Sequence, residues 1–368
     1  MQNVSVSYQQ TLRIASGQHI EEQMKAQGRE RELKAKARMR AIGMVVAVAV
    51  LALMSVIVML VLRSSRRTKK INAMISAYNA EITEKNDKIS MQNAVMTDSI
   101  NYASIIQIAA MPSKEEMENI FGDNLVWLKP RNVVSGDFFW TMDAERYKLL
   151  VVGDCTGHGV PGALLSMLGM SILDYMTRHF GTGDIQAAPL LDRMRRYFKR
   201  TLNQKSYRTD VAIDSIDLAL LVIDTETGLM QYTAAFRPLL IFRNGMPIKM
   251  RADSMPIGVY PKEKEHFTNN EIQLCKGDII YLYSDGFTDQ TGYESVLSPI
   301  ARAYTSKRFI NFLQKIHTLP FAMQYEKLNS EFEWWRSSKS PAQALCEQTD
   351  DNIVVGVAVN NFINNLPD

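Results

Sequence analysis

The feature that most constrains this chain of 368 residues is an uncharged apolar run, residues 41–62, whose only polar side chain is Ser55. A helix of about 20 such residues spans the roughly 30 Å hydrocarbon layer of a bilayer. A buried core helix would be expected to carry polar residues on some face. A cleaved signal peptide is disfavoured, because the polar segment 1–40 precedes the run and no clear small-residue cleavage site follows it. We therefore predict a transmembrane helix at residues 41–62.

Charge beside this run does not fix its orientation. The basic residues before it are Lys34, Lys36, Arg38 and Arg40, and those after it are Arg63, Arg66, Arg67, Lys69 and Lys70. Because both flanks are basic, the positive-inside rule does not decide which side faces the cytoplasm. The net charge of the whole chain is only +3, which gives no argument for nucleic acid as a partner. The clustered positive charge favours lipid headgroups instead.

The N-terminal segment, residues 1–40, is polar. From His19 to Arg40 it reads as a charged helix in which glutamates are interleaved with basic residues. This segment holds too little apolar surface for a core of its own. A solvated helix that runs into the membrane is favoured, and a stub of a sensor domain stays the alternative.

Residues 63–111 join the basic flank to the rest of the chain and carry a heptad pattern. One series of positions seven residues apart is apolar, and its companion series is largely polar. The first series is Ile75, Ile82, Ile89, Met96, Ala103 and Ala110, and the second is Ile71, Tyr78, Lys85, Gln92, Ser99 and Ile106. Such series fill the a and d positions of a coiled coil. We predict a parallel coiled-coil homodimer, and one amphipathic helix lying on its own domain is the alternative.

From Asn124 onward, short apolar runs typical of β-strands alternate with helical stretches. The strand-like runs are 125–127, 147–153, 218–224, 239–243, 278–283 and 353–359, and the helical stretches are 162–180, 187–202, 307–317 and 322–335. Strands with helices gathered around them indicate an α+β fold of packed layers. Met111-Pro112-Ser113 ends the preceding helix. We therefore predict one domain at residues 112–360, followed by a short tail at 361–368.

Four separated acidic motifs stand where strands are expected to meet loops. They are Ser135-Gly136-Asp137, the segment 153–159 with Asp154, Ser284-Asp285-Gly286 and Asp350-Asp351-Asn352. Carboxylates placed in this way can meet at one end of a sheet. Hard oxygen ligands suit Mg²⁺ or Mn²⁺ better than zinc, and the five histidines form no paired zinc motif. Two such ions about 3.5–4 Å apart activate a water for phosphoester hydrolysis.

Taken in order, these motifs resemble those of the metal-dependent serine/threonine protein phosphatases of the PPM (protein phosphatase 2C) type, in the SpoIIE-like branch. The resemblance covers residues 100–359. Its most specific part is Asp154-Cys155-Thr156-Gly157-His158-Gly159-Val160-Pro161-Gly162-Ala163, and the other matching segments are 130–140, 283–290 and 348–353. The resemblance implies a two-sheet β-sandwich flanked by helices, with two Mn²⁺ or Mg²⁺ ions in the cleft between the sheet edges.

The resemblance also implies a role for each acidic residue. Asp154 bridges both metal ions, and the backbone carbonyl of Cys155 completes one of the two sites. Asp285 and Asp351 each bind a metal ion, and Asp137 holds its ion, often through water. Asp350 either shares this work or accepts a hydrogen bond that orients its neighbour.

Two residues of the second motif need a separate argument. His158 lies four residues after Asp154, so it is a candidate catalytic acid that protonates the leaving serine oxygen. The alternative is that His158 hydrogen-bonds a carboxylate and holds the loop. Cys155 is poorly suited as a nucleophile, because no His–Cys pairing is evident and the family uses a metal-bound water.

The chain departs from the family pattern at one place. Many relatives carry Ala-Gly-His before a Pro-Leu pair, whereas here Ala235-Phe236-Arg237 precedes it. We expect this strand-edge position to shape substrate access while leaving the metal ligands intact. Asp214 and Asp217 lie at a strand start, and we interpret them as residues of the turn that support the ligands without binding metal.

The resemblance implies hydrolysis of phosphoserine or phosphothreonine on a signalling protein, such as an anti-sigma-factor antagonist. Cys155, Cys275 and Cys346 are far apart and odd in number, which favours a reducing compartment. We therefore expect a single-pass protein of the cell (inner) membrane with a cytoplasmic phosphatase domain. The alternative is a catalytically silent dimeric module that transduces a signal. The four acidic residues argue against it, because crowded carboxylates repel one another unless a metal ion offsets their charge.

Overall fold

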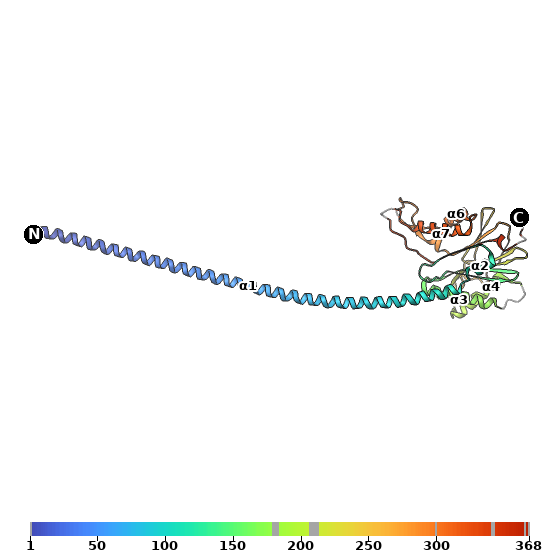
Figure 1. Cartoon of the computed structure of the whole chain (residues 1–368), viewed down its shortest axis with the longest axis horizontal. Helices are drawn as coiled ribbons and strands as arrows, with labels where there is room; N and C mark the ends of the chain where they lie inside the picture. Colours follow the sequence, from blue (N-terminus) through green and yellow to red (C-terminus); the bar gives the residue numbers. More distant parts are fainter. Residues whose placement is uncertain are drawn as a thin grey trace. The chain divides into compact units, whose positions relative to one another are not determined.

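The computed structural model describes residues 2–178, 184–205, 213–298, 300–339, 343–363 and 366. The chain divides into two compact units, Met1–Gln92 and Asn93–Asp368, and Figure 1 traces both. Residues 179–180 of the helix predicted at 162–180, and residues 364, 365, 367 and 368 of the predicted tail at 361–368, lie outside the described residues.

Helix α1 (Gln2–Ala110) runs through the first unit and extends into the sequence of the second. No proline occurs before Pro112, and exposed Glu–Lys pairs four residues apart, such as Glu21–Lys25 at 2.6 Å, add about 0.2–0.5 kcal/mol each. Pro112 cannot continue the helix. A capping box between Ser113 and Glu116 then starts α2 (Lys114–Phe121).

Among the described residues, two helices are long and apolar enough to cross a membrane by length and composition alone. In α1 the apolar window has a mean hydropathy of 3.2 with none of it buried, and in α3 (Gly159–Thr177) it has a mean hydropathy of 1.2 with half of it buried. Burial in the protein core accounts for the composition of α3. The helix predicted at residues 41–62 is present as part of α1, and its insertion in a membrane stays a prediction.

The described part of the second unit forms two five-stranded antiparallel sheets, with strand orders β1-β12-β9-β6-β7 and β2-β3-β4-β5-β8. The first sheet consists of β1 (Asn124–Lys129), β12 (Asn352–Ala358), β9 (Ile279–Tyr283), β6 (Leu239–Arg243) and β7 (Met246–Met250). The second consists of β2 (Phe138–Ala144), β3 (Tyr147–Cys155), β4 (Ile216–Asp224), β5 (Leu229–Ala235) and β8 (Asn270–Gln273). A separate short pair joins β10 (Thr291–Gly292) to β11 (Arg302–Ala303).

Helices cover the outer face of each sheet. Helices α3 and α4 (Ala187–Thr201) pack on the second sheet, and α6 (Ser306–Ile316) and α7 (Phe321–Arg336) pack on the first (Figure 1). Alternation along β6 shows the layering, since Leu239 and Ile241 belong to the core between the sheets whereas Leu240 and Phe242 pack under α6 and α7. This arrangement confirms the predicted α+β fold of two sheets flanked by helices.

The six predicted strands are all present, and their ends agree within two residues. The sequence reasoning missed β2, β5, β7 and β8 of the two large sheets and both strands of the short pair, β10 and β11. In β5 the buried polar residues Gln231 and Thr233 interrupt the apolar pattern, and the Gln231 side chain accepts a hydrogen bond from Ala187 N at 2.9 Å. In β8 the sequence Asn270-Glu271-Ile272-Gln273 is mostly polar because it forms an edge of its sheet. A small 3₁₀ turn, Val359–Asn361, follows β12.

Candidate functional site

The four acidic motifs lie at strand ends that the topology makes neighbours. Asp137 precedes β2 and Asp154 lies near the end of β3, and these two strands pair antiparallel. Asp285 follows β9 and Asp351 precedes β12, which are also antiparallel neighbours. In an antiparallel pair, the start of one strand and the end of the other lie side by side at the same end of the sheet. Each sheet therefore carries two of the acidic residues at one edge.

Hydrogen bonds join the two sheet edges directly. Ser284 Oγ, next to Asp285 on the first sheet, donates to Asp137 Oδ2 on the second at 2.6 Å. Here the first sheet also supplies an acceptor. The Asp351 carboxylate, just before β12, accepts hydrogen bonds from Gly136 N at 2.7 Å and from Arg131 N at 2.6 Å. These contacts bring the first, third and fourth motifs into one site.

Two glycines allow this close approach. A Cβ on Gly136 would lie 2.7 Å from the carbonyl oxygen of Gly157 and 3.3 Å from that of Cys155. A Cβ on Gly286 would overlap the carbonyl oxygen of Asp351. A side chain at either position would push two motifs apart, so glycine is needed there for contact between backbones.

The carboxylates of this site are held in an environment that disfavours their charge. Burial raises the pKa of Asp137 to about 8, against the hydrogen bond from Ser284, and the nearby Asp351 adds to the rise. Burial, and then repulsion by Asp137, raises the pKa of Asp154 well above its usual range. Burial also raises the pKa of Asp351, although two backbone N–H groups oppose the rise. Such a cluster attracts a cation.

A cation from the chain itself lies among these carboxylates. Arg237, in the connection between β5 and β6, places Nη2 2.8 Å from Asp154 Oδ2 and Nη1 2.6 Å from Asp285 Oδ2. The same Nη2 lies 3.0 Å from Asp217 Oδ2. Burial raises the pKa of Asp217 to about 6, and Arg237 opposes the rise. Arg237 thus joins acidic residues of both sheets.

The sequence reasoning did not place Arg237 and Asp217 among the carboxylates. It interpreted Arg237 as a residue that shapes substrate access and Asp217 as a residue of a turn. Asp217 lies in β4 directly opposite Asp154, at the start of an apolar run just as Asp154 ends one. That symmetry was a usable signal, because antiparallel neighbours bring such positions together. No feature of the sequence indicated where the side chain of Arg237 would point.

His158 and Cys155 stand beside this cluster. His158 directly precedes α3, and its ring is exposed. Its Nδ1 lies 2.8 Å from Asn132 Oδ1, within hydrogen-bond distance. That hydrogen bond goes to an amide and not to a carboxylate. Cys155 is buried, and burial raises the pKa of its thiol well above the usual value. A neutral buried thiol is a poor nucleophile, so the side chain of Cys155 supplies no catalytic group.

The donor chemistry of the site fits Mg²⁺ or Mn²⁺, because the convergent groups are carboxylate oxygens and a backbone carbonyl. The positions of these groups, however, are not those of a formed metal site. Across the residues that the structure describes, no three Asp, Glu, His or Cys side chains are placed to hold one metal ion together. Instead, the guanidinium of Arg237 stands between Asp154, Asp217 and Asp285.

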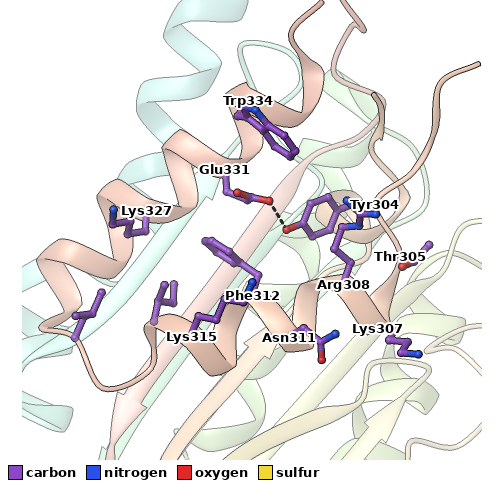
Figure 2. A pocket seen from close by; sticks show the side chains of 12 residues that line it. Tyr304, Thr305, Lys307, Arg308, Asn311, Phe312, Lys315, Lys327, Glu331 and Trp334 are labelled. Carbon is purple, nitrogen blue, oxygen red and sulfur yellow. Dashed lines mark hydrogen bonds between the residues drawn. The ribbon is translucent and has the colours of Figure 1, made fainter. Parts of the chain in front are cut away.

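A large cavity lies elsewhere in the phosphatase-like unit. It has a volume of about 900 Å³ and is lined by residues of α6 and α7 and of the segment before α6. Figure 2 shows its basic and aromatic side chains, including Lys315, Lys327 and Trp334, and the hydrogen bond from Tyr304 to Glu331 at 2.7 Å. None of the four acidic motifs lines it, so it is not the site of the carboxylate chemistry.

Comparisons with known proteins agree with the fold and the motifs. The SiaA-PP2C domain of Pseudomonas aeruginosa is similar in structure, with a TM-score of 0.60, 25% sequence identity, and coverage of 72% of this chain and 97% of that chain. A structure of the PP2C phosphatase domain and a fragment of the regulatory domain of SpoIIE from Bacillus subtilis matches with a TM-score of 0.47 and 18% identity, over 64% of this chain and 61% of that one. No curated protein matches the chain in sequence.

The sequence profile of the family described as Stage II sporulation protein E (SpoIIE) matches residues 144–357. This range is more than half of the chain, and it includes Asp154, Asp285 and Asp351 but not Asp137. The match confirms the resemblance stated from the motifs. The chain belongs to the SpoIIE family, the SpoIIE-like branch of the PPM (protein phosphatase 2C-type) phosphatases.

Proposed function

We propose that this chain is a membrane-anchored, metal-dependent protein phosphatase that hydrolyses phosphoserine or phosphothreonine on a signalling protein. One observation carries the proposal: Asp137, Asp154, Asp285 and Asp351 meet where the edges of the two sheets adjoin. The hydrogen bonds from Ser284 to Asp137 and from Gly136 to Asp351 stabilise this arrangement. Four buried or half-buried carboxylates in one region repel one another, and divalent cations relieve that repulsion.

In this proposal the acidic residues hold two Mn²⁺ or Mg²⁺ ions. Asp154, Asp285, Asp351 and Asp137 would supply carboxylate ligands, and the backbone carbonyl of Cys155, which lies close to Gly136, would add a further oxygen. When bound, such ions activate a water and stabilise charge on the phosphoryl group. Asp350 Oδ1 accepts a hydrogen bond from Asp351 N at 2.8 Å, which suits a residue that orients the ligand beside it.

His158 is the proposed proton donor to the leaving serine oxygen. Its ring is exposed and next to the motif of Asp154, and the hydrogen bond of Nδ1 to Asn132 leaves the other ring nitrogen to face a substrate. The helix α3 begins at Gly159 directly after it. The first N–H groups of a helix favour a phosphate group, so this end of α3 suits the binding of the phosphorylated residue.

The uncharged part of α1 is the proposed single membrane span at residues 41–62. Its side chains are exposed in the chain, for instance Leu51 at 63% and Leu60 at 59%, and exposed apolar surface of this extent is stable in lipid. Basic residues flank the span on both sides. The phosphatase domain at residues 112–360 would lie in the cytoplasm, since its three cysteines are free.

The proposed partners follow from the segment after the span. Ile75, Ile82 and Ile89 are each more than half exposed, which supports a coiled-coil homodimer through residues 63–111. An anti-sigma-factor antagonist, or a similar small phosphorylated protein, is the substrate class that the family resemblance favours. No nucleic acid partner is proposed.

One observation favours a second candidate, a catalytically silent module of the same fold that transduces a signal. Arg237 already neutralises part of the carboxylate cluster through Asp154, Asp217 and Asp285. A silent domain could keep such an arginine-bridged cluster as a structural element. The two candidates differ in metal binding.

The number of Mn²⁺ ions bound per chain separates them. The full-length protein, purified in detergent and stripped with a chelator, is titrated with Mn²⁺ while the free ion is followed by electron paramagnetic resonance. The phosphatase predicts two ions per chain, with loss of at least one in Asp285→Asn and in Asp351→Asn. Asp143→Asn, at the exposed far end of β2, is the matched control. No bound metal in the wild type would favour the silent module.

A further inference from the structure

The backbone that carries Arg237 is tightly built. Phe236, just before it, has a positive φ of 59°, which is uncommon for a large side chain. Phe236 N donates to Asp253 O at 2.9 Å, and the buried hydroxyl of Tyr232 donates to Arg237 O at 2.6 Å. A strained, hydrogen-bonded turn of this kind fixes the backbone position of Arg237, and from there its side chain reaches the carboxylates.

The guanidinium binds the oxygens that a metal ion would need. Its two terminal nitrogens contact Oδ2 of Asp154 and Oδ2 of Asp285, at 2.8 and 2.6 Å. The side chain of Arg237 is only 12% exposed, so water screens its charge poorly. A divalent ion needs these oxygens at about 2.0–2.1 Å for Mg²⁺. The two cations would lie side by side in a poorly screened site, and their repulsion opposes joint occupancy.

The guanidinium is also incompletely bonded. Within the described residues, Arg237 Nε is buried and has no hydrogen-bond partner. An arginine that serves only as a structural cross-link usually has its buried donors satisfied. The third contact, to Asp217 Oδ2 at 3.0 Å, involves a residue outside the four acidic motifs. Asp217 therefore remains as a partner for Arg237 when the other two carboxylates are engaged elsewhere.

We propose that Arg237 is a built-in competitor of the divalent cation: its guanidinium must leave Asp154 and Asp285 before these residues bind metal, and it thereby sets the metal affinity of the site. This inference rests on the proposed metal-dependent phosphatase. In the displaced state Arg237 stays paired with Asp217 in β4. Metal binding at this site is then an exchange of one cation for another and not the filling of a preformed cage.

The test compares Mn²⁺ affinity across variants of the full-length protein in detergent, with free Mn²⁺ measured by electron paramagnetic resonance. Arg237→Gln removes the competing charge and should lower the Kd for Mn²⁺ by at least about tenfold. Arg237→Lys keeps the positive charge but lacks the planar guanidinium that contacts both carboxylates. Its Kd should therefore lie between those of the wild type and Arg237→Gln. Arg146→Gln removes an arginine paired with Asp224 at the opposite end of the β2–β3 hairpin and should leave the Kd unchanged.

The outcomes are separable. An unchanged or higher Kd in both Arg237 variants, with binding still lost in Asp154→Asn, overturns the competitor role and leaves the metal site intact. No Mn²⁺ binding in any variant overturns both the competitor role and the proposed function. If Arg237→Gln does not fold, as judged by its tryptophan fluorescence and thermal unfolding, Arg237→Lys alone decides. A Kd in Arg237→Lys at or above that of the wild type then refutes the proposal.

Discussion

The side-chain amide of Gln107 forms hydrogen bonds with both the N–H and the C=O group of Ser135. Gln107 Nε2 donates to Ser135 O at 2.5 Å, and Ser135 N donates to Gln107 Oε1 at 3.0 Å. Gln107 lies in the last turns of α1 and is buried, and Ser135 begins the motif that contains Asp137. The end of α1 and the first acidic motif are therefore one structural element.

This relationship predicts the effect of Gln107→Ala. The substitution leaves the N–H and C=O groups of Ser135 without their partner in a buried place, so the free energy of unfolding should fall by about 1–3 kcal/mol. Gln27→Ala, on an exposed part of the same helix and outside both heptad series, is the control. Chemical denaturation measures both, and a Gln107→Ala value within about 0.5 kcal/mol of the control would show that the two hydrogen bonds are not important.

A steric prediction concerns Gly286. In Gly286→Ala the new methyl group overlaps the carbonyl oxygen of Asp351, so the third and fourth motifs must separate. The expected results are a loss of about 1–3 kcal/mol of stability and a higher Kd for Mn²⁺. Gly28→Ala, where a Cβ meets nothing within 4 Å, should not weaken the protein. Wild-type Mn²⁺ affinity in Gly286→Ala would mean that Asp285 and Asp351 act independently.

A pH prediction follows from Asp224. The hydrogen bond from Arg146 is the main reason that the pKa of Asp224 falls to about 2, below the roughly 3.9 of an unfolded Asp. A lowered folded-state pKa gives stability that is present above the unfolded pKa and is lost as the pH falls through the folded pKa. The difference in unfolding free energy between wild type and Asp224→Asn should be largest near neutral pH and shrink below about pH 4. A difference independent of pH would contradict this account.

A fourth prediction concerns the polar layers of the heptad. Replacing Lys85, Gln92 and Ser99 together with Leu should make the predicted seam apolar and stabilise one packing of the helix pair. In liposomes the variant should be a more stable dimer, as measured by chemical cross-linking, and its phosphatase activity should shift. Activity equal to that of the wild type would count against a signalling role for this helix.

Much of the fold was accessible from the sequence because apolar runs and acidic residues adjoin one another. Leu149-Leu150-Val151-Val152 before Asp154 predicted both β3 and the place of the carboxylate at its end. The same reasoning placed Asp285 after β9 and Asp351 before β12. Strands whose polar residues are satisfied by distant partners, such as Gln231 in β5 with Ala187 N, gave no such signal.

The parts of the site that were missed depend on side-chain direction. A sequence pattern shows that Arg237 replaces a residue common in relatives, but it does not show that the guanidinium reaches three carboxylates. That reach follows from the positive φ of Phe236 and the anchoring of the Arg237 carbonyl by Tyr232. The buried contact of Gln107 was hidden for a similar reason, since Gln107 belongs to neither of the two heptad series.

The proposed metal-dependent hydrolysis depends on the carboxylate cluster, and Asp154→Asn removes one charge from that cluster. The full-length protein, the variant and the Asp143→Asn control are assayed with a phosphoserine peptide and with p-nitrophenyl phosphate, each with a chelator and then with Mn²⁺ or Mg²⁺. The account predicts turnover that requires added metal in the wild type and the control and is lost in Asp154→Asn. Turnover that persists in the chelator, or that survives Asp154→Asn, would contradict it.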